Sequence, residues 1–153
     1  MITLKVGDKA PDFELNDQEG NIVRLADFKG KKIVLYFYPK DDTPGCTKEA
    51  CDFRDNFREL KKSNVEVLGV SNDDLESHKK FSSKYSLNFP ILSDTDKKIS
   101  RDYGVYDLKE KFGQQYYGIT RSTFVIDESG RIESIFYKVN PEQHINEIIE
   151  AIK

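Results

Sequence analysis

The chain has 153 residues, 37% hydrophobic and 33% charged, with 10 Phe and 8 Tyr, which is typical of a globular protein with one core and excludes a disordered chain. Its net charge of -3 comes from interspersed charges of both signs, which argues against nucleic acid or an anionic membrane surface as a partner. The longest apolar run, residues 33–38, is far too short to span a bilayer.

The first predicted elements are short strands. Residues 11–15 and 21–25 flank a polar, glycine-containing turn at residues 17–21, which is the pattern of a β-hairpin. The apolar run 33–38 is rich in β-branched and aromatic residues and predicts a central strand buried on both faces.

A loop and a long helix are predicted next. Residues 39–46 have the Pro, Asp and Gly content of a loop. We expect a helix from about residue 44 to residue 62, with Thr43 as its N-cap and Pro44 at its first position. Its apolar stripe consists of Phe53, Phe57 and Leu60.

The second half of the chain continues to alternate between strands and helices. We predict a buried strand over 65–71, a polar helix over about 74–85, a short strand over 89–93 and a short helix between Asp94 and Gly104. Residues 105–121 show no clear period and are predicted to form a long loop, whose Phe112, Tyr116 and Tyr117 could line a dimer contact or cover a site.

The last elements are a hairpin and a helix. Strands over 123–127 and 132–137 flank the turn at Glu128-Ser129-Gly130, and a closing helix begins near Pro141. A βαβ core followed by a hairpin and a helix predicts one α/β domain over residues 1–153. A thioredoxin-like fold, with a mixed central sheet flanked by helices, is the simplest layout that fits.

The two cysteines, Cys46 and Cys51, carry the strongest functional signal. The chain begins without the apolar segment of a secretory signal, so we expect a cytoplasmic protein, in which two close cysteines are more often redox-active or metal-binding than structural. Cys46 falls in the first turn of the predicted helix, where unpaired N–H groups and the helix dipole favour its thiolate. The polar residues around it predict an accessible sulfur instead of an inert core cysteine.

Cys51 follows five residues later on the same predicted helix. An ideal helix separates two such Cα atoms by about 8.6 Å, whereas a disulfide needs them within about 7 Å. If the two cysteines bond, the first turn must therefore unwind, which makes this segment a two-state element.

A metal site is the alternative use of the cysteines. Zinc takes four ligands, and the other soft candidates are His78 and His144. We interpret both histidines as surface residues without a function, and we expect neither a metal nor an organic cofactor.

The residues Pro39, Thr43 and Cys46, together with the distant Arg121, resemble the active-site motif of peroxiredoxins. The spacing between Cys46 and Cys51 is similar to that of the Q-type, or bacterioferritin-comigratory-protein, branch. The resemblance extends along nearly the whole chain, through residues 7–13, 67–71, 92–94 and 103–105.

The resemblance implies a thioredoxin fold with an N-terminal extension, here the β-hairpin, and a peroxidase that reduces hydrogen peroxide and organic hydroperoxides. It implies that Cys46 is the peroxidatic residue and that Cys51 resolves the oxidised product as an intramolecular disulfide. A thioredoxin-like dithiol would then reduce the disulfide, and the protein would be a monomer or a weak homodimer.

The remaining motif residues fit this chemistry. Arg121 can stabilise the charge that develops on the leaving oxygen, and Thr43 can place a hydroxyl against the sulfur and the peroxide. The backbone N–H groups of Gly45 and Cys46 can donate to the peroxide oxygens, and Pro39 can exclude water.

Three points stay open from the sequence. Glu49 could pair with Arg121 or Arg54, or face solvent, and we leave it out of the catalytic set. A general disulfide oxidoreductase on the same fold is an alternative, which the spacing of the two cysteines disfavours. A redox sensor that uses the same disulfide to reshape a surface is the second alternative.

Overall fold

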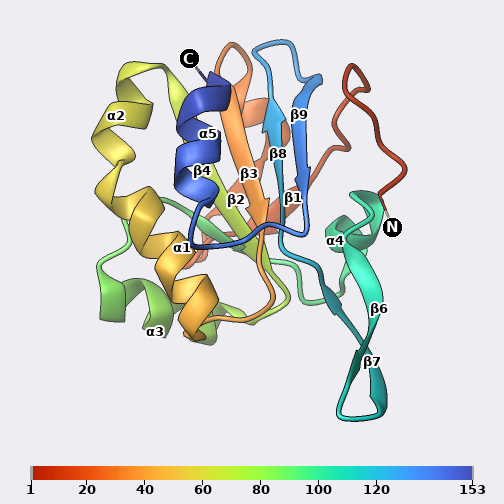
Figure 1. Cartoon of the computed structure of the whole chain (residues 1–153). Coiled ribbons are helices and arrows are strands. Elements are labelled where there is room, and N and C mark those ends of the chain that lie inside the picture. The colour runs from red at the N-terminus through yellow and green to blue at the C-terminus, as the bar shows by residue number, and fades with distance from the viewer. Residues whose placement is uncertain (1, 153) are drawn as a thin grey trace.

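The computed structural model of the chain describes residues 2–152 and is built on a seven-stranded mixed sheet (Figure 1). The strand order is β2-β1-β5-β4-β3-β8-β9. β3 (Lys32–Phe37), β4 (Val65–Ser71) and β5 (Ile91–Ser93) are parallel, whereas β8 (Ser122–Ile126) pairs antiparallel with β3, and β9 (Ile132–Tyr137) antiparallel with β8. The predicted mixed sheet of a thioredoxin-like fold is confirmed.

The predicted N-terminal hairpin extends this sheet at one edge. β1 (Glu14–Asn16) and β2 (Ile22–Arg24) are shorter than predicted and pair antiparallel around the expected turn. β1 then joins the sheet through Asn16, which lies opposite Ser93 of β5, and a 3-10 helix (Leu25–Phe28) leads to β3.

Helices cover both faces of the sheet because the side chains of β3 are apolar on both. One face packs against α1 (Pro44–Asp55), α2 (Phe57–Lys62), α3 (Leu75–Tyr85) and α5 (His144–Ile152). The other face packs against the N-terminal segment and α4 (Lys98–Asp102). Figure 1 shows α1 and α5 in front of the sheet, with α4 to the right. In the part of the chain that the structure describes, no helix is both long and apolar enough to cross a membrane.

The predicted helix over 44–62 is interrupted at Asn56. This residue has φ −104° and ψ 9°, outside the helical range, and its side-chain amide donates to the carbonyl of Asp52 at 2.8 Å. Asparagine side chains compete with the helix for backbone carbonyls. The chain therefore forms two helices, α1 and α2, instead of one.

The prediction of a long loop over residues 105–121 is wrong. Residues Tyr106–Lys111 (β6) and Gln114–Ile119 (β7) form an antiparallel hairpin that projects from the body of the molecule (Figure 1). Its turn is formed by Phe112 and Gly113, both with positive φ, 53° and 76°. Most side chains of the two strands are exposed, so the alternation of apolar and polar residues that marks a half-buried strand is absent.

Candidate active site

The start of α1 is formed as the sequence predicts. Thr43 is the N-cap, with φ −102° and ψ 155°, and Pro44 is the first helical residue. The carbonyl of Thr43 accepts the first helical hydrogen bond, from the N–H of Thr47 at 2.8 Å. The Thr43 hydroxyl makes no capping bond and instead donates to the carbonyl of Lys40 at 2.9 Å, which closes the loop before the helix.

Cys46 is the third residue of α1, and its side chain is buried, with 1% exposed. The prediction of an accessible sulfur is wrong in this respect, because Cys46 packs in the apolar cluster between the sheet and the helices. The sulfur is nevertheless not isolated from charge. The Nη2 atom of Arg121 lies 3.3 Å from Sγ, so a cation and the N-terminal turn of a helix both face it.

The register of the sheet brings Arg121 to this position. β8 begins at Ser122, which lies opposite Phe37 at the end of β3. Arg121 therefore precedes β8 at the same edge of the sheet where the chain leaves β3 toward α1. The predicted association of Arg121 with Cys46 depends on this antiparallel pairing.

Arg121 is held in place by Glu49. Its Nη1 atom donates to Oε1 of Glu49 at 2.7 Å, and the Glu49 side chain is only 1% exposed. Burial raises the pKa of Glu49 to about 7, and Arg121 partly opposes this shift. Arg54, the other candidate partner, binds Asp55 instead. Glu49 lies one helical turn after Cys46 and so shares its face, which is the signal by which the sequence could have assigned it to the site.

Gly45 leaves the space that the guanidinium occupies. A Cβ atom at this position would lie 3.0 Å from Nη2 of Arg121 and 3.3 Å from Cγ of Pro141. Gly45 and Cys46 are the second and third residues of α1, where backbone N–H groups have no partner within the helix. These groups are available to an oxygen atom of a substrate.

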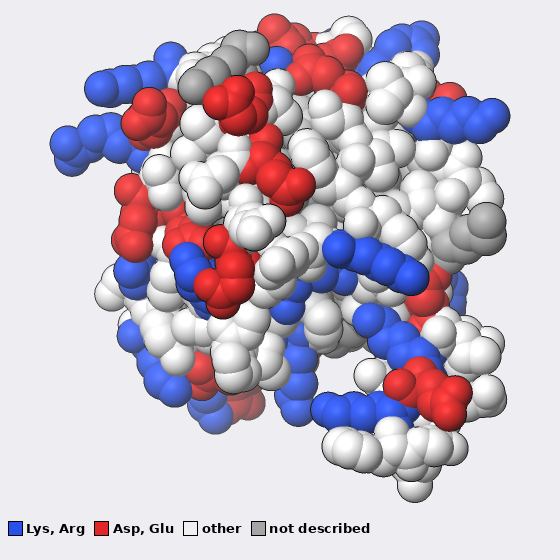
Figure 2. All heavy atoms as spheres, in the orientation of Figure 1, with Lys and Arg blue, Asp and Glu red and all other residues white. Residues whose placement is uncertain are grey.

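Pro39 lies exposed, one residue after the buried Tyr38. It lines a hollow of about 660 Å³ between the body and the β6–β7 hairpin, and the lining includes several lysines. Figure 2 shows basic side chains, in blue, beside the gap between the body and the hairpin. Lys109 in this hollow has its pKa lowered, first by burial and then by the charge of Arg121, although Asp107 opposes the shift.

Cys51 is half-buried and lies on the same unbroken helix as Cys46, and both thiols are free. The ideal-helix separation of about 8.6 Å between their Cα atoms therefore applies to this state. A bond between these sulfurs requires part of α1 to unwind.

Both histidines are buried, and the prediction that they are surface residues is wrong. His78 has no exposed surface and is hydrogen-bonded at both ring nitrogens. His144 is 1% exposed, with Nε2 at 2.7 Å from the hydroxyl of Thr123 and Nδ1 at 3.2 Å from Glu147. Burial lowers the pKa of His144. The sequence held a signal for both, because His78 lies three residues before Phe81 and His144 four residues before Ile148, on the buried faces of α3 and α5.

Comparisons with known proteins show the family of the chain. The model of the AhpC/TSA family matches residues 6–135. The chain is 47% identical over 152 residues to "Peroxiredoxin Bcp" of Bacillus subtilis (strain 168), which covers 99% of this chain and 97% of that protein.

Two solved structures are similar along nearly the whole chain. One is the bacterioferritin comigratory protein of Xanthomonas campestris, studied for alkyl peroxide reduction, with a TM-score of 0.90 and 35% identity over 99% of this chain and 97% of that one. The other is a cysteine-to-serine mutant of PrxQ from Xylella fastidiosa, with a TM-score of 0.93 and 31% identity over 98% and 96% of the two chains.

Proposed function

The chain belongs to the AhpC/TSA family and is a thiol peroxidase, and from this premise we propose that Cys46 is the residue that attacks the peroxide. The observation that carries this assignment is the 3.3 Å contact between the Cys46 sulfur and Arg121 at the first turn of α1. A fixed guanidinium favours the anionic sulfur and stabilises the charge that moves to the leaving oxygen.

The first step is a displacement at oxygen. The Cys46 thiolate forms an S–O bond while the O–O bond of the peroxide breaks, which gives a sulfenic acid and an alkoxide or hydroxide that takes up a proton. The N–H groups of Gly45 and Cys46 donate to the peroxide oxygens. The Thr43 hydroxyl, whose hydrogen is directed to the carbonyl of Lys40, accepts a hydrogen bond from the O–H of the peroxide. Pro39 shields one side of the site from water.

The second step uses Cys51. After the start of α1 unwinds, the Cys51 sulfur attacks the sulfenic sulfur, an S–S bond forms, and the oxygen leaves as water. A dithiol reductant of the thioredoxin type then restores both thiols by exchange. The substrates are hydrogen peroxide and organic hydroperoxides, and the protein works as a monomer or a weak homodimer.

Mass spectrometry tests the scheme. The reduced protein is treated with one equivalent of hydrogen peroxide and digested without reductant. We expect a loss of two mass units that maps to a bond between residues 46 and 51. Cys46→Ser should consume no peroxide, and peroxidase activity retained in that variant would refute the assignment.

A further inference from the structure

The loop that joins β3 to α1 carries two consecutive aspartates that attach it to α3. Asp41 points inward and is 7% exposed, whereas Asp42, which has a positive φ of 56°, points outward. Asp42, the second of these aspartates, lies only four residues before Cys46.

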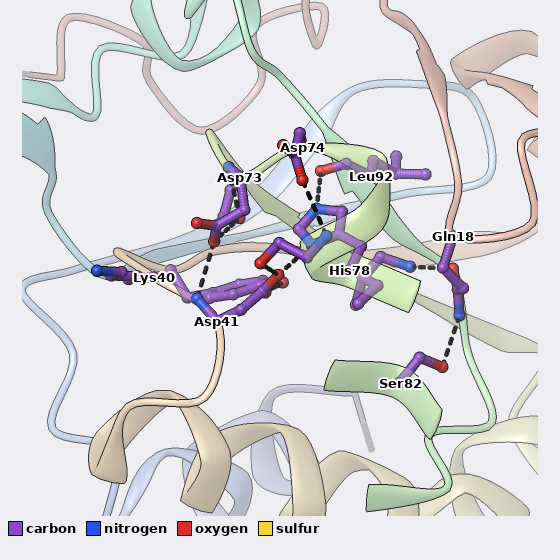
Figure 3. Close-up of polar contacts among 12 residues, drawn as sticks. Gln18, Lys40, Asp41, Asp73, Asp74, His78, Ser82 and Leu92 are labelled. Carbon is purple, nitrogen blue, oxygen red and sulfur yellow. Dashed lines mark hydrogen bonds and ion pairs between the residues drawn. The ribbon is translucent and has the colours of Figure 1, made fainter. Parts of the chain in front are cut away.

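Asp41 is held by a set of donors that we call the loop anchor: Tyr38, Ser77 and His78. The Tyr38 hydroxyl donates to Oδ1 at 2.6 Å, and the Ser77 hydroxyl donates to Oδ2 at 2.8 Å. His78 Nδ1 lies 2.6 Å from the same Oδ2 atom. Burial, reinforced by the charge of Asp41, raises the pKa of Tyr38 well above its usual value, so its hydroxyl stays a donor. Figure 3 shows His78 directed toward Asp41 from α3.

The surroundings of His78 give each of its ring nitrogens a hydrogen-bond partner. Nε2 lies 3.0 Å from the carbonyl oxygen of Leu92, which can only accept a hydrogen bond, and Nδ1 faces the carboxylate of Asp41. Nε2 therefore donates to Leu92, and one proton lies between Nδ1 and Oδ2 of Asp41, so both ring nitrogens of His78 are engaged. The other charged group of the cluster is Asp73, which follows β4 and accepts the backbone N–H of Asp41 at 2.8 Å.

A cation site is the alternative interpretation of this cluster. Ligand atoms of Asp41, Asp73 and His78 lie within 4.8 Å of one another. Nδ1 of His78 is already bonded to Oδ2 of Asp41, and the Asp41 oxygens also accept bonds from the Tyr38 and Ser77 hydroxyls. The hydrogen-bond pattern therefore favours a buried hydrogen-bonded pair over a metal site.

Asp42, which points outward, contributes only weakly to the attachment of the loop to α3. Asp42 accepts from Lys84 at 2.8 Å and from the Tyr85 hydroxyl at 2.7 Å, on the exposed end of α3. Exposed ion pairs contribute little, whereas loss of one partner of a buried pair leaves an uncompensated charge. The position of the loop therefore depends mainly on His78 and Asp41.

We propose that His78 is a positioning residue for the peroxidase reaction, because its buried hydrogen bond to Asp41 fixes the loop that places Thr43 and Cys46 relative to Arg121. The proposal rests on the proposed role of Cys46. It predicts that the step requiring the intact start of α1, attack on the peroxide, depends on His78. Disulfide formation takes place after the start of α1 has unwound, at residues that follow the loop anchor in the chain. Its rate therefore does not depend on the loop anchor.

The test measures the two steps separately in the reduced full-length chain, by rapid quenching and mass spectrometry. His78→Leu removes both ring donors, and His78→Asn keeps one donor for Asp41. We expect His78→Leu to slow the oxidation of Cys46 at least about tenfold, because small displacements of a catalytic group are costly. His78→Asn should recover most of this rate, and the disulfide step should stay within about twofold in both variants. The control is Lys80→Ala on the exposed side of α3, which should change neither step.

Several results would overturn the proposal. One is a folded His78→Leu variant that is oxidised within about twofold of the wild-type rate, and another is an equal slowing of both steps. Proton NMR of the wild-type protein provides a test that does not depend on the folding of any variant: we expect a downfield signal from the proton between Nδ1 of His78 and Asp41, and its absence refutes this hydrogen bond. Activity in Cys46→Ser would instead refute the proposed function, whatever the behaviour of His78.

Discussion

Glu49 and Arg121, 72 residues apart in the sequence, form a buried ion pair of 2.7 Å beside the start of α1. One guanidinium nitrogen is fixed by the carboxylate, and a second one is thereby directed at the sulfur of Cys46, 3.3 Å away. The planar fork of arginine allows both contacts at once. The position of the Arg121 guanidinium thus depends on Glu49, which lies on the same helix as Cys46.

Replacement of Arg121 should slow the oxidation of Cys46 without preventing folding. Arg121→Gln loses the charge beside Cys46, and we expect the rate constant of oxidation by hydrogen peroxide to fall about 10²-fold, as for other removed electrostatic donors. Arg121→Lys should also be slow, because a single ammonium cannot contact both Glu49 and Cys46. Competition with a reporter peroxidase measures the rate, since the chain has no Trp.

The control for these variants is Arg58→Gln, which removes an exposed arginine from α2. It should be oxidised at the wild-type rate. Equal rates in Arg121→Gln and Arg58→Gln would show that Arg121 does not act on the sulfur.

Gly45→Ala should lower activity through a contact with Arg121. The φ of Gly45 is compatible with alanine, so the backbone of α1 accepts the change. The new Cβ would lie 3.0 Å from Nη2 of Arg121, so the guanidinium must shift, which disturbs its contact with the sulfur. We expect slower oxidation of Cys46 in a protein that stays folded.

The matched control for Gly45→Ala is Gly118→Ala in β7. Its Cβ would meet a Tyr116 atom at 3.4 Å, which is an ordinary contact, and the variant should keep the wild-type oxidation rate. A Gly45→Ala protein that is oxidised as fast as this control would contradict the proposed packing of Arg121.

Cys51→Ser should stop the cycle after its first step. The variant keeps Cys46 and Arg121, so we expect one equivalent of peroxide to be consumed at the wild-type rate. The product should be a sulfenic acid, with a gain of one oxygen in mass instead of a loss of two hydrogens. Turnover with a thioredoxin-type reductant should be lost, and sustained turnover would remove the resolving role from Cys51.

Glu49 should make the stability of the protein depend on pH. Burial raises its pKa from 4.5 to about 7, so between these values the folded protein binds this proton more tightly than the unfolded chain does. The free energy of unfolding should therefore fall as the pH rises through this window, by up to about 3 kcal/mol from this group. Glu49→Gln should lack this decrease.

Urea denaturation at several pH values measures the effect. Glu59→Gln, which alters an exposed carboxylate of α2, is the control and should keep the wild-type pH dependence. The same slope in Glu49→Gln and in the wild type would show that Glu49 does not titrate as the structure implies.

Much of the fold follows from local sequence patterns. The apolar run at 33–38, the turn at 17–21 and the Thr43-Pro44 pair each signal one element through neighbouring residues, and each element is found within a few residues of its predicted bounds. Segments that lack such local signals are not predicted correctly from the sequence. The exposed β6–β7 hairpin has no apolar alternation, and the side chain of Asn56 interrupts a helix that periodicity would continue.

The sequence alone determined where Cys46 lies in the first turn of a helix and how far Cys51 follows it, because both depend on residues close together in the chain. Only the tertiary structure decided what surrounds the sulfur. The pairing of β3 with β8 delivers Arg121, the packing of α1 buries Cys46 and Glu49, and α3 brings His78 to Asp41. These contacts join segments far apart in the chain, and the burial that gives them their strength arises only when the helices close over the sheet.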